Sequence, residues 1–294
     1  MMSNALWLLA VIGAIETDPA ATAPPPKMLV NSAALMAFLA VGTCVLLAWL
    51  VRRIGSPRKL WLTNTPRRPN RVNPIHVLGL FGAYILVQWA AGGVLARWYG
   101  EEDFRLLVLA TLCGQAVLLV AALAVAAKTF RWGLQRGLGL SGRHWLCDCA
   151  RGALGYMAVI PVCYALLAVG MSVVPEAWQE THRVLIAVGE ASVAWRLAIL
   201  VSTVLLAPLA EELLFRGLLQ SMLRRWMNTW LAIALTSLVF AAMHVGQWHA
   251  MGAIAALSVA LGYNYERTGR LLPAIVMHAL FNAVNVWIYL ASAS

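Results

Sequence analysis

Apolar runs long enough to cross a bilayer recur through almost the whole chain, and this pattern constrains the fold more than any other feature. A bilayer core about 30 Å thick is crossed by about 20 apolar helical residues. The runs that meet this length, or approach it, are residues 28–51, 75–96, 106–127, 152–174, 195–223, 229–247, 249–265 and 271–291. The sequence therefore predicts an all-α, polytopic transmembrane helical bundle with about eight spans.

The composition excludes a water-soluble domain. Of the 294 residues, 62% are hydrophobic and 12% are charged, whereas about 25% of the residues in soluble domains are charged. The net charge of +10 suits either nucleic acid or a membrane surface. The basic residues lie mostly in short loops beside apolar runs, as in the cytoplasmic loops of membrane proteins. We therefore expect membrane lipid and no nucleic acid as a partner, and a multi-pass protein of the bacterial cytoplasmic membrane.

Three regions divide the chain. Residues 1–27 form an N-terminal segment, apolar at first and then rich in proline. This segment has no basic stretch before its apolar part, so signal peptide and peripheral segment both stay open. Residues 28–194 hold the N-terminal transmembrane helices and basic loops. Residues 195–294 hold the predicted catalytic transmembrane core.

Charged residues within the span at 195–223 are the first indication of a functional site. Each charge at the centre of a span costs about 2.5–3.5 kcal/mol on insertion scales, so Glu211, Glu212 and Arg216 need a reason to be there. Glu212 and Arg216 are four residues apart, on one helix face, and are predicted to form an ion pair. Glu211 is rotated by about 100° from Glu212. One carboxylate is thus satisfied and the other is available.

Two further spans carry polar side chains. His244 lies near the end of the run at 229–247, one turn after Phe240, and His278 and Asn282 are four residues apart in the last run. Straight helices would place these groups at different depths from Glu211. Either Pro208 and Pro273 mark bends, or a water-filled cavity lined by Arg267 and Arg270 reaches the site. The cavity is preferred, because polar groups that react with water inside a membrane must have access to it.

The cluster supports two chemical schemes. In one, Glu211 is a general base that takes a proton from water, His244 orients that water, and His278 and Asn282 donate to the oxyanion. In the other, Glu211, His244 and His278 bind one divalent metal, such as zinc, which lowers the pKa of a bound water. The spacing of the residues does not separate the two schemes.

The string EELLFRG, followed by Phe240-x-x-x-His244 and His278-x-x-x-Asn282, resembles the three motifs of the CPBP family. This family includes the Ras-converting CAAX endopeptidases and the bacterial Abi, or bacteriocin-processing, proteins. The resemblance covers roughly residues 195–291. It implies an intramembrane endopeptidase that cleaves a membrane-associated, CAAX-like prenylated substrate. Similar members are called metalloproteases, although the glutamate mechanism of the CAAX endopeptidases needs no bound metal.

The resemblance also implies roles for individual residues. Glu211 would activate water beside His244, and His278 with Asn282 would form the oxyanion site. The supporting residues would be Glu212, Arg216 and Phe240.

Two other readings of the same residues stay open. Glu211, Glu212 and the histidines are also what a transporter or proton relay would use. A non-catalytic membrane scaffold, of the bacteriocin-immunity type, would keep them for stability.

Overall fold

A computed structural model describes most of the chain. The described residues are 26–55, 62, 65, 68–99, 103–140, 142–179, 187–189 and 191–293. The N-terminal segment predicted at 1–27 lies almost entirely outside them.

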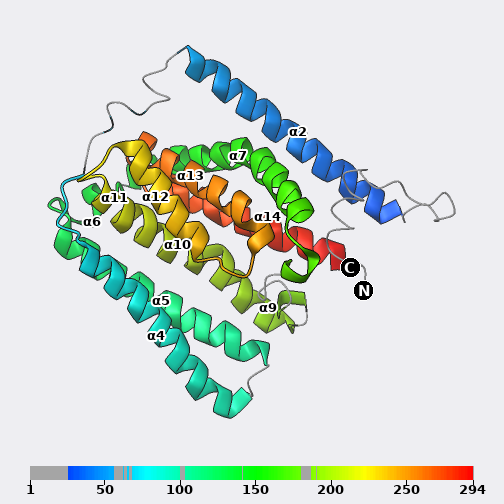
Figure 1. The fold of residues 1–294 in the computed structure, drawn as a ribbon, viewed down its shortest axis with the longest axis horizontal. Helices are drawn as coiled ribbons and strands as arrows, with labels where there is room; N and C mark the ends of the chain where they lie inside the picture. The colour runs from blue at the N-terminus through cyan, green and yellow to red at the C-terminus, as the bar shows by residue number, and fades with distance from the viewer. Residues whose placement is uncertain are drawn as a thin grey trace.

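The described part is a helical bundle (Figure 1), and it has two isolated β-bridges, Asn70 with Phe130 and Gln179 with Gln247. Its continuous helices are α2 (Pro26–Ile54), α4 (Pro74–Tyr99), α5 (Phe104–Thr129), α7 (Trp145–Val173), α12 (Thr229–Ala242), α13 (Met251–Thr268) and α14 (Leu272–Ala293). Short connecting helices are α6 (Gly133–Gly137), η1 (Gly142–His144), η2 (Glu176–Trp178) and η5 (Trp248–Ala250). One further span, Val193–Leu223, is built from several pieces. These are α9 (Val193–Leu200), η3 (Val201–Leu206), α10 (Ala207–Glu212), η4 (Leu213–Gln220) and α11 (Ser221–Leu223).

The helices are arranged around a central group. In Figure 1, α2 lies along the outside of the bundle next to α7, and the α4–α5 hairpin lies on the opposite side. The composite span, α12, α13 and α14 lie between them. The predicted catalytic region is therefore flanked on both sides by the N-terminal helices.

Six of the described helices are long and apolar enough to cross a membrane. They match six of the predicted spans, which confirms the all-α multi-pass membrane fold. The remaining two predicted spans correspond to α12, which has 14 residues, and α13, which ends in polar residues and is not among the six. The predicted total of about eight is thus only approximate.

The composite span is distorted around Pro208. The segments η3 and η4 are π-helical, and α10 lies between them with Pro208 in its first turn. Proline lacks a backbone N–H, and π-helical turns in α-helices are frequent at functional sites. The distortion lies beside Pro208, and the choice between bends and a water-filled cavity stays a prediction. The distortion places Glu211 and Glu212 at the last two positions of α10, directly before η4.

Local signals fix the ends of the helices near the site. The side chain of Asn228 accepts a hydrogen bond from the Leu231 N–H and caps the start of α12. Gly269 ends α13 in the left-handed conformation, with φ of 70°, which favours glycine at this position. The chain then turns into α14 within three residues.

Candidate active site

Glu212 and Arg216 form a fully buried ion pair. Arg216 Nη1 lies 2.9 Å from Glu212 Oε1, and both side chains are 0% exposed. The second guanidinium nitrogen, Nη2, donates to the carbonyl and the hydroxyl of Ser258 on α13, at 3.0 and 2.6 Å. The ion pair predicted from the i,i+4 spacing is therefore present. It joins the composite span to α13.

His278 of α14 approaches both glutamates. Its Nδ1 lies 2.9 Å from Glu212 Oε1, and its Nε2 lies 3.8 Å from Glu211 Oε2. An ionised carboxylate only accepts hydrogen bonds, so Nδ1 is the donor to Glu212. This contact turns Nε2 toward Glu211. Two of the three motifs thus meet at one depth of the bundle.

Glu211 is the more accessible carboxylate of the pair. Its side chain is 25% exposed, against 0% for Glu212. The separation of 3.8 Å from His278 Nε2 exceeds a direct hydrogen bond. A single water molecule beside both atoms can bond to each of them. The geometry therefore gives the two glutamates different environments, as the sequence predicted.

His244 lies in the turn after α12, half-buried. Its Nδ1 lies 2.9 Å from the carbonyl oxygen of Phe240. Because a carbonyl only accepts, Nδ1 carries the hydrogen in this contact, and Nε2 is the nitrogen that can take a proton. The predicted pairing of His244 with Glu211 stays a prediction.

Asn282 lies one turn beyond His278 on α14. Its Nδ2 donates to the backbone carbonyl of Thr203, at 2.8 Å. Thr203 belongs to the π-helical η3, so the side chain of Asn282 bonds to the distorted part of the composite span. The amide nitrogen has a second hydrogen, through which the predicted oxyanion role remains chemically open.

The residues proposed for a metal do not form a ligand set as they are placed. Among the described residues, no three or more His, Cys, Asp or Glu side chains form a group that could hold a metal ion. Glu211 and His278 approach each other, while His244 is bonded to the backbone. A role for zinc or another divalent metal stays a prediction.

Phe240 packs at the centre of these groups. Its ring centroid lies 4.9 Å from the ring of His244 and 5.8 Å from that of His278. The guanidinium carbon of Arg216 lies 4.8 Å from the same centroid, within the range of a cation–π contact. Phe240 is 1% exposed. Its position suits the supporting role that was expected for it.

Sequence reasoning missed a polar stripe that continues beyond the ion pair. Glu212, Arg216, Gln220 and Arg224 recur every four residues, and all four are buried. The partners of this stripe lie on α13, also at intervals of four, and are Ser258, Gly262 and Glu266. The repeated spacing was a readable signal.

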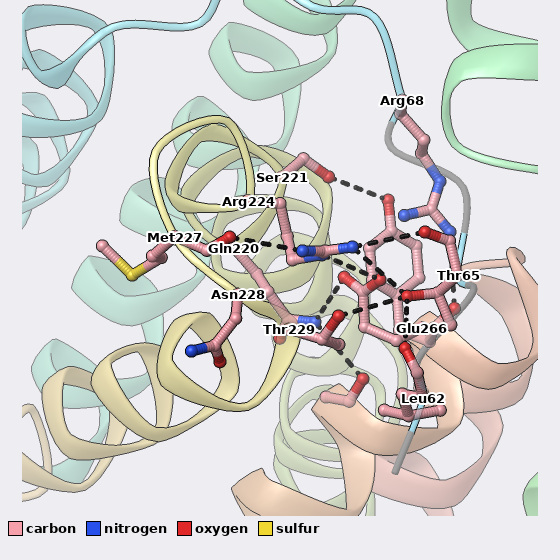
Figure 2. A network of polar contacts seen from close by, with 12 residues as sticks. Leu62, Thr65, Arg68, Gln220, Ser221, Arg224, Met227, Asn228, Thr229 and Glu266 are labelled. Carbon is pink, nitrogen blue, oxygen red and sulfur yellow. Dashed lines mark hydrogen bonds and ion pairs between the residues drawn. The ribbon is translucent and has the colours of Figure 1, made fainter. Parts of the chain in front are cut away.

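The far end of the stripe is shown in Figure 2. Arg224 reaches from Glu266 to Thr65, with Nε 3.4 Å from Glu266 Oε2 and Nη2 3.2 Å from Thr65 Oγ1. Gln220 donates to the other oxygen of Glu266 at 3.0 Å. Arg68 lies over the ring of Tyr265, with 3.8 Å between its guanidinium carbon and the centroid. Thr65 and Arg68, which precede α4, thereby contact the end of the composite span and α13.

Comparison with known proteins bears on this same region. A family model described as Rce1-like, type II CAAX prenyl endopeptidase, matches residues 193–284, about a third of the chain. A protein of Bacillus subtilis (strain 168), described as the uncharacterized protein YpbD, is 37% identical over 83 residues. That alignment covers 27% of this chain and 40% of the relative. No solved structure gives a significant match.

The family match spans the glutamates, Phe240, both histidines and Asn282, which are the residues that carried the resemblance. Residues 193–284 of this multi-pass membrane protein are similar to the Rce1-like family, and this match bears out the resemblance to CAAX proteases that the motifs carried.

Proposed function

We propose that this protein is an intramembrane endopeptidase that hydrolyses a peptide bond of a membrane-associated substrate by means of a water activated by Glu211. The proposal is supported most by one observation. Two adjacent glutamates contact one histidine, yet only Glu212 is neutralised by an arginine, and only Glu211 is partly exposed.

The difference in exposure and pairing between the carboxylates of Glu211 and Glu212 suits general base catalysis. Glu211 accepts a proton from water as the water oxygen attacks the scissile carbonyl carbon, and it returns the proton to the leaving amine. Glu212 is held by Arg216 and His278 and keeps its place throughout. His244 Nε2 is the second group that can orient the water.

The oxyanion role of His278 sets a condition on its protonation. Nδ1 donates to Glu212, so Nε2 donates to an oxyanion only in the doubly protonated ring. In that form the imidazolium lies between the carboxylate of Glu212 and the developing negative charge. The second hydrogen of the Asn282 amide would complete the pair of donors.

The substrate class follows from the location of the site. The reacting groups lie on α10, on α14 and in the turn after α12 of a membrane bundle, so the scissile bond must be close to the bilayer. The Rce1-like match extends the proposal to a peptide with a prenylated CAAX-like end. Membership of the Abi branch and the use of a metal are not needed for this chemistry.

Cleavage of a fluorogenic peptide by the purified protein in liposomes tests the proposal, with prenylated and unprenylated versions compared. Glu211→Gln is expected to lower kcat by about 10²- to 10⁴-fold, because the general base is lost. Asp103→Asn makes the same carboxylate-to-amide change outside the site and should leave kcat unchanged. A Glu211→Gln protein that is folded and fully active would refute the mechanism.

The rival function is proton or cation transport, favoured by the buried stripe that leads away from the site. Liposomes with a pH-sensitive dye distinguish the two. Proton flux that Glu211→Gln abolishes, in protein that cleaves no peptide, would establish the transporter. Cleavage without flux would establish the protease.

A further inference from the structure

Five buried polar atoms near the proposed site have no hydrogen-bond partner among the described residues. They are Glu212 Oε2, Arg216 Nε, Gln220 Oε1, Thr236 Oγ1 and Ser237 Oγ. All five residues are at most 3% exposed. Buried polar groups in native proteins are almost always bonded to protein or to ordered water. Five such atoms in one part of a bundle therefore point to a ligand.

The five atoms come from two helix faces. Three belong to the stripe that runs through α10 and η4. The other two belong to α12, where Ile233, Thr236, Ser237 and Phe240 have the spacing i, i+3, i+4 and i+7. Residues with this spacing share one helix face. Thr236 and Ser237 thus lie between Ile233 and Phe240 along a single face of α12.

That face of α12 packs against the stripe. A Cβ atom placed on Gly262 would lie 3.2 Å from Ile233 Cγ2 and 2.7 Å from Gln220 Oε1. Ile233 is therefore at the level of Gln220. About two turns further along the same face, the ring of Phe240 lies against the guanidinium of Arg216. Thr236 and Ser237 consequently lie at the level between Gln220 and Arg216.

The chemistry of the five atoms selects water as the ligand. Arg216 Nε is a donor, Gln220 Oε1 and Glu212 Oε2 are acceptors, and a hydroxyl can be either. A buried water makes two to four such bonds, with both kinds of partner. A metal cation is disfavoured by the adjacent guanidinium of Arg216, and an anion is disfavoured by the carboxylate of Glu212.

We propose that water binds between α12 and the stripe, and bridges the hydroxyls of Thr236 and Ser237 to Gln220 and Arg216. The bound water holds the guanidinium of Arg216 from the side that Ser258 and Glu212 leave open. Arg216 in turn fixes Glu212, and Glu212 fixes His278. Thr236 and Ser237 are thus positioning residues, a role that rests on the proposed function, whereas the water site itself does not.

Radiolytic labelling in H₂¹⁸O tests the water site without any substrate. Phe240 is the adjacent reporter, and Phe38 of α2, which is partly buried against an apolar cluster, is the reference. In the natural protein, Phe240 should take up more ¹⁸O than Phe38. In Thr236→Val/Ser237→Ala, the label on Phe240 should fall to the level of Phe38.

Two results would overturn the water site. One is a natural protein in which Phe240 is labelled no more than Phe38. The other is a double variant that keeps the full label, because the label would then come from water at the catalytic groups. Thr43→Val, on the exposed side of α2, is the matched control and should leave the label unchanged.

Peptide cleavage then tests the positioning role. The double variant should lower kcat by about 10- to 100-fold with KM unchanged, because a small misplacement of catalytic groups has effects of this size. Thr236→Ser/Ser237→Thr keeps both hydroxyls and should restore the label and kcat. A double variant that loses the label yet keeps kcat would overturn the positioning role alone.

Discussion

Helices α4 and α14 have the same mean hydropathy over their most apolar windows, 1.6 in each, but they face different surroundings. In α4, 11% of that window is buried inside the protein, and in α14 the share is 28%. Trp89 and Leu78 on α4 are 77% and 68% exposed. The apolar side chains of α4 therefore serve mainly as a surface for lipid, while α14 is buried more within the protein and carries the candidate site residues His278 and Asn282.

The comparison shows what hydropathy can and cannot say about a membrane chain. In a bilayer an apolar side chain is equally well placed against lipid or protein, so the apolar residues do not mark the core. The polar residues do, because each one that is removed from water needs a partner. Glu212, Arg216 and His278 thus locate the protein interior better than any leucine.

The largest expected effect is on the buried ion pair. Arg216→Met leaves the carboxylate of Glu212 buried and without its cation, and should lower the free energy of unfolding by about 3–5 kcal/mol. Denaturant titration of the protein in detergent micelles, followed by tryptophan fluorescence, measures this loss.

The paired variant Glu212→Gln/Arg216→Met removes both charges and should lose clearly less stability than Arg216→Met. Equal losses in the two proteins would mean that the pair contributes packing rather than charge neutralisation. Burial of charged side chains would then distinguish the interior from the lipid face less sharply.

A buried leucine in the composite span provides the next test. Leu218 of η4 is 0% exposed, and Leu218→Ala should lower the free energy of unfolding by about 2–5 kcal/mol, because it leaves a cavity. The same titration in micelles applies. A loss below about 0.5 kcal/mol, the range of surface substitutions, would show that the centre of the bundle is loosely packed.

Much of this site was predictable because its polar residues recur with the period of an α-helix. The four-residue spacing of Glu212 and Arg216 predicted their ion pair, and the scarcity of charges within spans marked Glu211 as unusual. The all-α membrane fold followed from the length of the apolar runs. These features depend on local sequence alone.

Other features depend on contacts between distant segments and left no such signal. Asn282 bonds to the backbone of Thr203, and the side chain of Thr203 plays no part in that contact. The π-helical turns on either side of Pro208 are not visible in a 3.6-residue pattern. Ser258 contacts Arg216 because of how α13 and η4 are aligned along their axes. The spacing of residues within one helix does not predict that alignment.

A turn outside the spans should give an intermediate effect. Gly139 has φ of 67°, and a Cβ placed on it would lie 2.2 Å from the carbonyl oxygen of Gly269. Gly139→Ala should lower the free energy of unfolding by about 1–3 kcal/mol through backbone strain. Gly142→Ala is the control, because no atom lies within 4 Å of its Cβ position. Equal stability of both variants would show that this turn adjusts freely.

The smallest effect is expected on the lipid face of α4. Leu86 is 63% exposed, and Leu86→Ala should change the free energy of unfolding by less than about 0.5 kcal/mol. The lipid or detergent around this side chain fills the space that the shorter alanine leaves, so no cavity forms. Denaturant titration of Leu86→Ala and of Leu218→Ala, the same substitution in the interior, measures how much the loss of unfolding free energy differs between the two regions. If Leu86→Ala were as damaging as Leu218→Ala, then α4 would be covered by protein in the micelle, and its exposed face would be a contact surface between chains.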